Sequence, residues 1–206
     1  MLRSLALIAS LVVLVPSVHA EDAKAVAAAL KQGGYVIVFR HGETTVGKGA
    51  ADPMGAGRGK STSTERQLSP RGRQAARAIG DAFKTLHIPI GSVYASQLDR
   101  AVETGRLISG KEVTTTADLT EAGDHVTLPE KERRAEAMLK IAGTAPAKRT
   151  NTLVVSHKPN IVDAFGKDWA DVREGEATIF RPDGSGKFVL VGRVQASEWS
   201  ELAQRR

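Results

Sequence analysis

The sequence predicts an α/β fold, a three-layer α/β/α sandwich with a mostly parallel central sheet. Short runs of β-branched and aromatic residues, typical of buried strands, alternate along the chain with longer amphipathic stretches that are typical of helices. Such alternation favours parallel strands joined by helices that cover both faces of a sheet. The end of the chain differs, because residues 177–181 and 187–194 flank Pro182-Asp183-Gly184, which predicts an antiparallel hairpin.

The first half of the chain contributes two helices and two strands. An alanine-rich stretch with Asp22 as a candidate cap predicts the first helix, and Ser69 followed by Pro70 has the pattern of a second helix start. Between them, residues 44–65 are polar and show no periodicity, which predicts a long loop. In chain order we expect a helix at 22–32, a strand at 35–40, a helix from Ser69-Pro70 to about Leu86 and a strand at 92–96.

The second half continues the alternation. Asp99 is a candidate cap for the helix that follows the second strand. The run Thr152-Leu153-Val154-Val155 is the clearest buried strand of this half. In chain order we expect a helix from Asp99 to about Ser109, a strand at 111–116, a helix at 129–141, a strand at 151–156, a helix opening at Pro159-Asn160 and the terminal hairpin.

The first 20 residues have the organisation of a secretory signal peptide. A basic start precedes an apolar core from Leu5 to Val15, and Val18-His19-Ala20 offers small residues at the cleavage-determining positions. We therefore expect residues 1–20 to be removed and residues 21–206 to form a single domain with a sizeable core. The expected location is periplasmic or secreted, and no membrane anchor is expected after cleavage, because the apolar stretch is too short to span a bilayer comfortably.

Two features of the composition narrow the function classes. The chain has no cysteine, which excludes disulfides, a thiol nucleophile, a Cys-ligated metal and a lipoprotein anchor. The formal net charge of +6 favours anionic partners such as phosphate esters. Nucleic acid is not expected as a partner, because the chain has only two Trp, two Tyr and five Phe and no basic run interleaved with them.

The most informative motif is Arg40-His41-Gly42-Glu43, which follows the apolar run of the first strand. In open α/β sheets, ligands bind outside the carboxyl ends of the strands. An imidazole there can attack phosphorus, and a guanidinium can hold phosphoryl oxygens. Successive strand residues point to opposite faces, so Arg40 and His41 can share one pocket only if the chain turns at Gly42, where a glycine also allows a close approach of backbone and phosphate. Alone, the motif is also compatible with a polar strand end in which His41 only bonds its own turn.

Two later strand ends carry the same kind of chemistry. The second strand ends at Ser96 and leads to Arg100, and the strand at 151–156 leads directly to His157. If these strands are neighbours, two imidazoles and two guanidinium groups converge on one rim of the sheet. Such a set can hold a dianionic phosphoryl group.

Together these motifs resemble those of the histidine phosphatase superfamily, in its phosphoglycerate mutase-like branch. The matching segments are Arg40-His41-Gly42-Glu43-Thr44, residues 96–104 with Arg100, Val155-Ser156-His157, and the helix start at 68–75. The resemblance covers nearly all of the chain after residue 20. It implies a phosphoglycerate mutase-like fold and a reaction that needs no cofactor and no metal.

The resemblance also implies a role for each matched residue. His41 would be the nucleophile that forms a phosphohistidine, and neighbouring arginines favour the neutral imidazole that this attack requires. Arg40, Arg100 and His157 would bind the phosphoryl oxygens and stabilise the charge that builds during transfer. Further candidates for contacts with the substrate are Gly42, Thr44 and Arg66.

The proton donor for the leaving group is expected to be a carboxylic acid. In the mutase-like branch a glutamate after the third strand has this role, and Leu119-Thr120-Glu121 occupies that place. Asp124 and Glu43 are the alternatives. The histidine acid phosphatase branch instead has an aspartate directly after the late histidine, where this chain has Lys158, so that branch is disfavoured.

The combined features predict an exported phosphatase. The chain has Thr45-Val46-Gly47 where phosphoglycerate mutases continue toward a Trp-Asn pair, so hydrolysis is favoured over mutase activity. The expected substrate is a small-molecule phosphate ester or a phosphoprotein, turned over by a monomer or weak dimer through phospho-His41. Two alternatives stay open at this point: a phosphatase of protein phosphohistidine, and a non-catalytic module that binds phosphate or a polyanion on the same fold.

Overall fold

The computed structural model of the chain describes residues 20–45, 65–121 and 126–204. The expected signal peptide lies almost wholly outside these residues, so its removal stays a prediction. Within the described ranges, no helix has both the length and the apolar character needed to cross a membrane.

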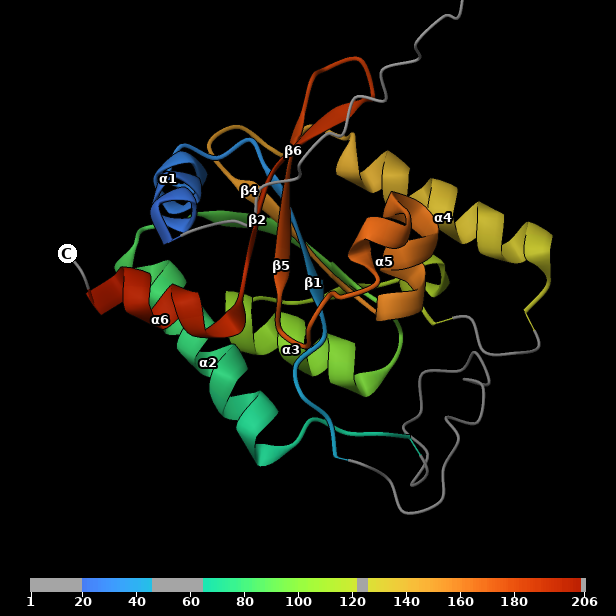
Figure 1. The fold of residues 1–206 in the computed structure, drawn as a ribbon, viewed down its shortest axis with the longest axis horizontal. Helices are drawn as coiled ribbons and strands as arrows, with labels where there is room; N and C mark the ends of the chain where they lie inside the picture. The colour runs from blue at the N-terminus through green and yellow to red at the C-terminus, as the bar shows by residue number, and fades with distance from the viewer. Residues whose placement is uncertain (1–19, 46–64, 122–125, 205–206) are drawn as a thin grey trace, which may run out of the picture.

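The described residues build one six-stranded sheet (Figure 1). Across the sheet the strands are β3 (Thr114–Thr115), β2 (Ile90–Ala95), β4 (Asn151–Ser156), β1 (Val36–Arg40), β5 (Ala177–Pro182) and β6 (Phe188–Val194). The first four strands in this order are parallel to one another, whereas β5 is antiparallel to both β1 and β6. The predicted mostly parallel sheet with a terminal hairpin is therefore confirmed.

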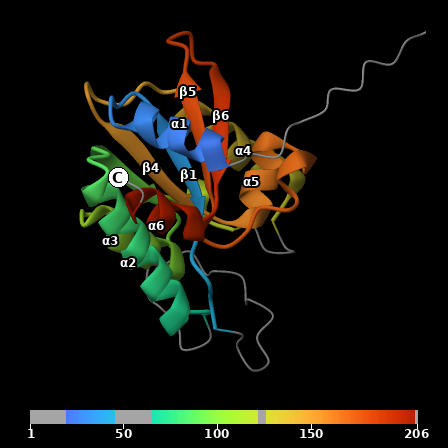
Figure 2. The same ribbon diagram turned by 60° about the vertical axis from the view of Figure 1, so that its left-hand side comes forward.

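Helices cover both faces of the sheet, which gives the predicted three layers (Figures 1 and 2). One face packs against α1 (Ala20–Leu30), α2 (Pro70–Thr85), α3 (Asp99–Ser109) and α6 (Ala196–Gln204). The other face packs against α4 (Leu128–Ala142) and α5 (Lys158–Phe165), with short 3-10 turns η1 (Ala117–Leu119) and η2 (Lys167–Trp169) beside them. The strand β1 contributes alternate residues to the two cores, as its pleat requires.

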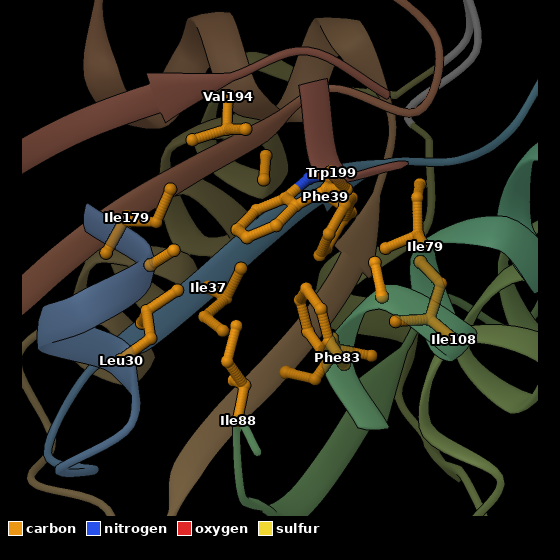
Figure 3. Close-up of a cluster of buried hydrophobic side chains, with 14 of the residues drawn as sticks. Leu30, Ile37, Phe39, Ile79, Phe83, Ile88, Ile108, Ile179, Val194 and Trp199 are labelled. Carbon is orange, nitrogen blue, oxygen red and sulfur yellow. The ribbon is translucent and has the colours of Figure 1, made fainter. Parts of the chain in front are cut away.

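The larger core lies under α1, α2, α3 and α6 and is shown in Figure 3. Phe83 of α2 stands edge-on to Trp199 of α6, with ring centroids 4.9 Å apart, and tilts against Phe39 of β1 at 6.3 Å. Edge-to-face aromatic pairs at such distances are favourable beyond their area of burial. This core fixes the end of β1, where the Arg40-His41 motif begins.

Several predicted boundaries are correct, and β4 has the predicted bounds. Ser69 caps α2 as expected, because its hydroxyl accepts a hydrogen bond of 2.9 Å from the Gly72 N–H. The prediction that Asp99 caps α3 is wrong: Leu98 occupies the cap position and Asp99 is the first helical residue. Its backbone N–H donates instead to the Glu65 carboxylate at 2.8 Å.

Three other elements differ from the expectation. The strand expected at 111–116 shortens to Thr114–Thr115, because it is the edge of the sheet and its two side chains are exposed. The first helix extends over Ala20–Leu30 rather than 22–32. The terminal helix α6 had no predicted counterpart, although it buries Trp199 fully.

Candidate active site

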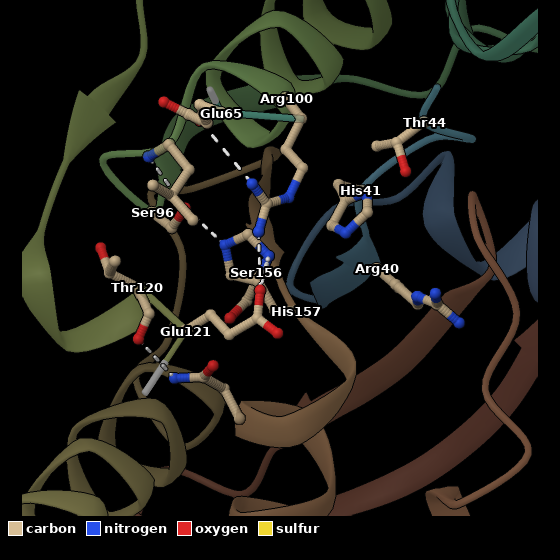
Figure 4. A network of polar contacts seen from close by, with 12 residues as sticks. Arg40, His41, Thr44, Glu65, Ser96, Arg100, Thr120, Glu121, Ser156 and His157 are labelled. Atoms are coloured by element: carbon tan, nitrogen blue, oxygen red, sulfur yellow. Dashed lines mark hydrogen bonds and ion pairs between the residues drawn. The ribbon is translucent and has the colours of Figure 1, made fainter. Parts of the chain in front are cut away.

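The ends of three parallel strands bring the predicted motifs together (Figure 4). Arg40 at the end of β1 is in register with Ser156 of β4, and Ala95 of β2 is in register with Val155. His41 and His157 therefore follow neighbouring strands, and their ring centroids lie 5.1 Å apart. Parallel strands place their carboxyl ends at one edge of a sheet, which is where ligands bind in open α/β folds.

His41 is buried, and its surroundings define its tautomer. Its Nδ1 lies 2.8 Å from the Gly42 carbonyl oxygen, which can only accept, so Nδ1 carries the proton and Nε2 keeps the lone pair. Burial is the main cause that lowers the pKa of His41 to about 3, and Arg100, Arg40 and Arg66 lower it further. The imidazole is therefore neutral at neutral pH. Burial is the larger cause, and the arginines add to it.

His157 is fully buried on the other side of the site. Its Nε2 lies 2.7 Å from the Ser96 hydroxyl, and its Nδ1 lies 3.6 Å from Oε2 of Glu121. That Nδ1 is buried and has no hydrogen-bond partner among the described residues. Burial, followed by the neighbouring His41 and Arg100, holds the pKa of His157 well below its usual value.

Arg100 lies in the first turn of α3 and is fully buried. Its Nη2 donates to Oε2 of Glu121 at 2.6 Å, and its Nη1 lies 3.7 Å from Oε1 of Glu65. The Glu65 carboxylate also accepts from the start of α3, so it ties the guanidinium to its own helix. Sequence reasoning missed Glu65, because it lies at the end of a polar stretch without periodicity.

Arg40 is held from the opposite side. Its Nη1 donates to the Val172 carbonyl oxygen at 2.9 Å, and its Nη2 to Oε1 of Glu174 at 3.4 Å. Its Nε is buried and has no hydrogen-bond partner among the described residues. Buried donors without partners are rare, and an oxyanion would satisfy them.

The structure places the predicted donor Glu121 beside Arg100 and His157, and it places Glu43 against the start of α2. The Glu121 carboxylate contacts both Arg100 and His157. The Glu43 carboxylate instead accepts from the Ser69 hydroxyl at 2.8 Å and lies 3.6 Å from Arg71, at the start of α2. The remaining candidate, Asp124, lies outside the described residues.

The three further candidates for substrate contacts lie around His41. The Gly42 N–H donates to the Thr104 hydroxyl at 3.0 Å, and a Cβ at Gly42 would lie 3.3 Å from the Gly72 carbonyl oxygen. A side chain at this position would therefore crowd the start of α2, and the approach of Gly42 to phosphate stays a prediction. Thr44 donates to Glu174 at 3.5 Å, and Arg66 is near enough to lower the pKa values of both histidines.

In the part of the chain that the structure describes, no three His, Asp or Glu side chains lie together as a metal site would need. The groups that converge are positively charged guanidinium groups and neutral imidazole groups, with carboxylates at their edges. Such a set is suited to binding and transferring a phosphoryl group, because that reaction depends on positioning and electrostatic stabilisation.

Solved structures with similar folds include phosphatases. The chain matches a mutant phosphoserine phosphatase from Entamoeba histolytica in complex with phosphoserine, with a TM-score of 0.56, 18% identity and coverage of 80% of this chain and 98% of that one. It matches the protein histidine phosphatase SixA complexed with tungstate with a TM-score of 0.55, 17% identity and coverage of 79% and 97%. A mycobacterial glucosyl-3-phosphoglycerate phosphatase with inorganic phosphate matches with a TM-score of 0.52, 18% identity and coverage of 80% and 99%. At such identities these likenesses establish the fold alone.

Comparison with curated proteins finds no match. A family model does match, over residues 36–147, which is more than half of the 206 residues. The matched range includes His41, Arg100 and Glu121 and ends before His157, whose place beside His41 comes from the pairing of β1 with β4. The motifs, the fold and the family model agree, and the chain belongs to the histidine phosphatase superfamily, branch 1.

Proposed function

We propose that this protein is a phosphatase that hydrolyses a phosphomonoester, or a phosphoprotein, through a phosphohistidine on His41. The observation that carries the proposal is a neutral, buried imidazole with its lone pair on Nε2, placed beside His157 and between two arginines. Neutral Nε2 is the form that can attack phosphorus. Arg40 and Arg100 supply the positive charge that phosphoryl oxygens need, so no metal is required by the mechanism we propose.

In the first step, Nε2 of His41 attacks phosphorus, so that the P–N bond forms and the bond to the leaving oxygen breaks. The leaving alkoxide takes a proton from Glu121. The carboxylate lies next to Arg100 and His157, hence beside the expected position of the phosphoryl group.

In the second step, water attacks phosphorus and gives its proton to Glu121, while the P–N bond breaks and His41 is released. Inorganic phosphate and an alcohol are the products. A neutral His157 with its proton on Nδ1 donates to a phosphoryl oxygen, while its Nε2 accepts from the Ser96 hydroxyl. The buried and unpartnered Nδ1 supports this assignment.

The test is covalent capture on His41. Purified protein is mixed with an aryl phosphate, quenched in alkali and digested, and the peptide that contains His41 is analysed for phosphohistidine. The wild type and the control His87→Asn, which changes an exposed histidine, should form the adduct and turn over the substrate. His41→Asn should do neither, with a loss of at least about a thousandfold in turnover.

The same experiment distinguishes a phosphatase from the main alternative, a non-catalytic module that binds phosphate. A protein that binds inorganic phosphate but never forms phosphohistidine in any variant is a binding module on this fold. Turnover that is equal in the wild type and in His41→Asn would overturn the proposed nucleophile.

We also propose that the protein is exported, with residues 1–20 removed. The support is the basic, apolar and small-residue order of the N-terminal segment. Fractionation of the native host and N-terminal sequencing test this point. A mature chain that begins at Glu21 in the periplasm or the medium is expected, and intact protein in the cytoplasm would contradict it.

A further inference from the structure

A second segment, remote in sequence, encloses the first motif. Residues Val172–Glu176, which we call the clasp, lie against Arg40 and His41 just before β5. The Arg40 N–H donates to the Glu176 carbonyl oxygen at 3.2 Å. The Gly175 N–H lies within 3.1 Å of the Arg40 carbonyl oxygen and 3.0 Å of the His41 carbonyl oxygen. The clasp therefore holds the backbone of the residues proposed to bind and attack the phosphoryl group.

The clasp also holds the Arg40 side chain. The Val172 carbonyl and the Glu174 carboxylate accept from Nη1 and Nη2, and the buried Nε is the guanidinium nitrogen that has no hydrogen-bond partner among the described residues. Glu174 accepts in addition from the Thr44 hydroxyl at 3.5 Å, so one carboxylate contacts both ends of the first motif. Burial lowers the pKa of the Arg40 guanidinium, and Glu174 is the largest influence in the opposite direction.

The clasp is itself anchored in the fold. The carboxylate of Glu176 is fully buried and accepts from the Arg193 side chain, from Gln195 at 2.6 Å and from the Arg173 N–H at 3.1 Å. Arg193 and Gln195 lie at the end of β6, so the terminal hairpin supports the clasp. These hydrogen bonds hold Glu176, the last residue of the clasp, in place beside β5.

We propose that Glu174 is a positioning residue for the phosphoryl-transfer site. It holds the terminal nitrogens of Arg40 so that the Nε–H is the group offered to a phosphoryl oxygen. This inference rests on the proposed function, because it concerns the same phosphoryl group. It extends that function to a residue that the matched motifs do not contain, in the part of the chain after the family model ends.

Two opposing effects decide whether a substitution of Glu174 weakens or strengthens phosphate binding. A carboxylate near a dianion disfavours phosphate binding, whereas an oriented arginine favours it. The Glu174 carboxylate is already paired with Arg40 and accepts from Thr44, which offsets part of its repulsion of a dianion, so orientation is expected to dominate. The loss of one hydrogen bond to a charged group corresponds to a change of about tenfold.

The experiment compares three variants of Glu174 by phosphate binding and by turnover. Glu174→Ala should weaken the binding of inorganic phosphate and lower kcat/KM by about tenfold. Glu174→Gln keeps the length of the side chain and an oxygen that accepts hydrogen bonds, so it should retain most of the phosphate binding and of kcat/KM. Glu174→Asp keeps the charge but withdraws the carboxylate from Arg40, so it should recover less than Gln. This order distinguishes orientation from charge.

The matched control is Glu103→Ala. It removes another partly buried Arg–Glu pair, in which the side chains of Arg73 and Glu103 are 33% and 32% exposed and which includes neither histidine. Phosphate binding per folded molecule should be unchanged in this control, with folding checked by thermal unfolding. If Glu174→Ala fails to fold, the comparison of Gln with Asp carries the test.

The outcomes separate this inference from the proposed function. Wild-type protein that neither binds phosphate nor forms phosphohistidine overturns both. Wild-type protein that forms phosphohistidine, together with Glu174 variants that match the control or bind phosphate more tightly, overturns the positioning role alone. Equal recovery by Asp and Gln also overturns it, because orientation requires the longer side chain.

Discussion

The two halves of the sheet contribute to the site in different ways. The parallel half, from β3 to β1, ends in the side chains proposed to react or to bind phosphate, among them His41 and His157. The antiparallel half, β5 and β6, reaches the site through the clasp, by three backbone groups and one carboxylate. The parallel half therefore supplies the reacting groups, and the antiparallel half holds them in place from the same edge of the sheet.

The strongest test of this division is Glu121→Gln. If Glu121 is the proton donor, the variant should lose about a hundredfold or more in kcat/KM with an alkyl phosphate, because alkoxide is a poor leaving group. With phosphoimidazole or an aryl phosphate the loss should be small. The control is Glu132→Gln on the exposed surface of α4, which should match the wild type on every substrate.

The pattern across substrates also bears on the physiological reaction. An equal loss on all substrates would mean that Glu121 acts only by holding Arg100 and His157. A wild-type enzyme that strongly prefers phosphoimidazole, and is indifferent to Glu121→Gln, would point to protein phosphohistidine as the substrate. Folds like this one occur in phosphatases for both small esters and protein phosphohistidine, so the fold itself does not choose between them.

A second test concerns the burial of the reacting groups in the parallel half. The pKa of His41 is about 3 in the folded protein, against about 6.5 in an unfolded chain. Below about pH 6.5 the unfolded state binds a proton that the folded state does not, so stability falls as the pH drops from about 6.5 toward 3. At pH 5 this effect amounts to about 2 kcal/mol for His41.

His41→Asn removes that proton-binding difference. The loss of unfolding free energy between about pH 7.5 and about pH 5, measured by urea denaturation, should be smaller in the variant by about 2 kcal/mol. The control His87→Asn should keep the full loss. Removal of His41 also removes one cause that lowers the pKa of His157, so any change at His157 decreases the loss in the variant in the same direction. An identical pH dependence in His41→Asn and the wild type would show that His41 is not held neutral by burial.

Much of the parallel half could be predicted from the sequence, because its signals are local. The run at 151–156 is apolar and bounded by polar residues, and it has the predicted limits. His41, Arg100, Glu121 and His157 follow parallel strands closely in sequence, so placing the strands side by side places these residues together. Each of these residues lies only a few positions along the chain from the strand that places it at the site.

The antiparallel half could not be predicted in the same way. Val172 and Gly175 act on the Arg40-His41 segment through backbone groups, which leave no trace in side-chain patterns, and they are separated from Arg40 by more than 130 residues. Residues 174–176 precede the predicted hairpin and include a glycine, which is typical of a turn. Glu174 belongs to that turn and also contacts the site, which sequence spacing alone does not reveal.

The smallest expected effect concerns the clasp. It tests whether the clasp positions Arg40 and His41 independently of its contribution to the stability of the fold. Gly175 has φ of +76°, and a Cβ there would lie 3.2 Å from the Cβ of Ala196. Gly175→Ala should lower the free energy of unfolding by about 1 kcal/mol because of the positive φ. It should also shift the clasp and weaken phosphate binding severalfold, by less than the loss from Glu174→Ala.

Gly184 offers a matched control within the same half. Its φ is +84° and a Cβ there would meet nothing within 4 Å, so Gly184→Ala carries the same backbone strain in the hairpin turn without the contact. Both variants should lose similar stability in urea denaturation, whereas only Gly175→Ala should weaken the binding of inorganic phosphate. Equal weakening in both would mean that the hairpin acts on the site through its general stability. In that case the clasp would not orient Arg40 and His41 separately from its role in folding.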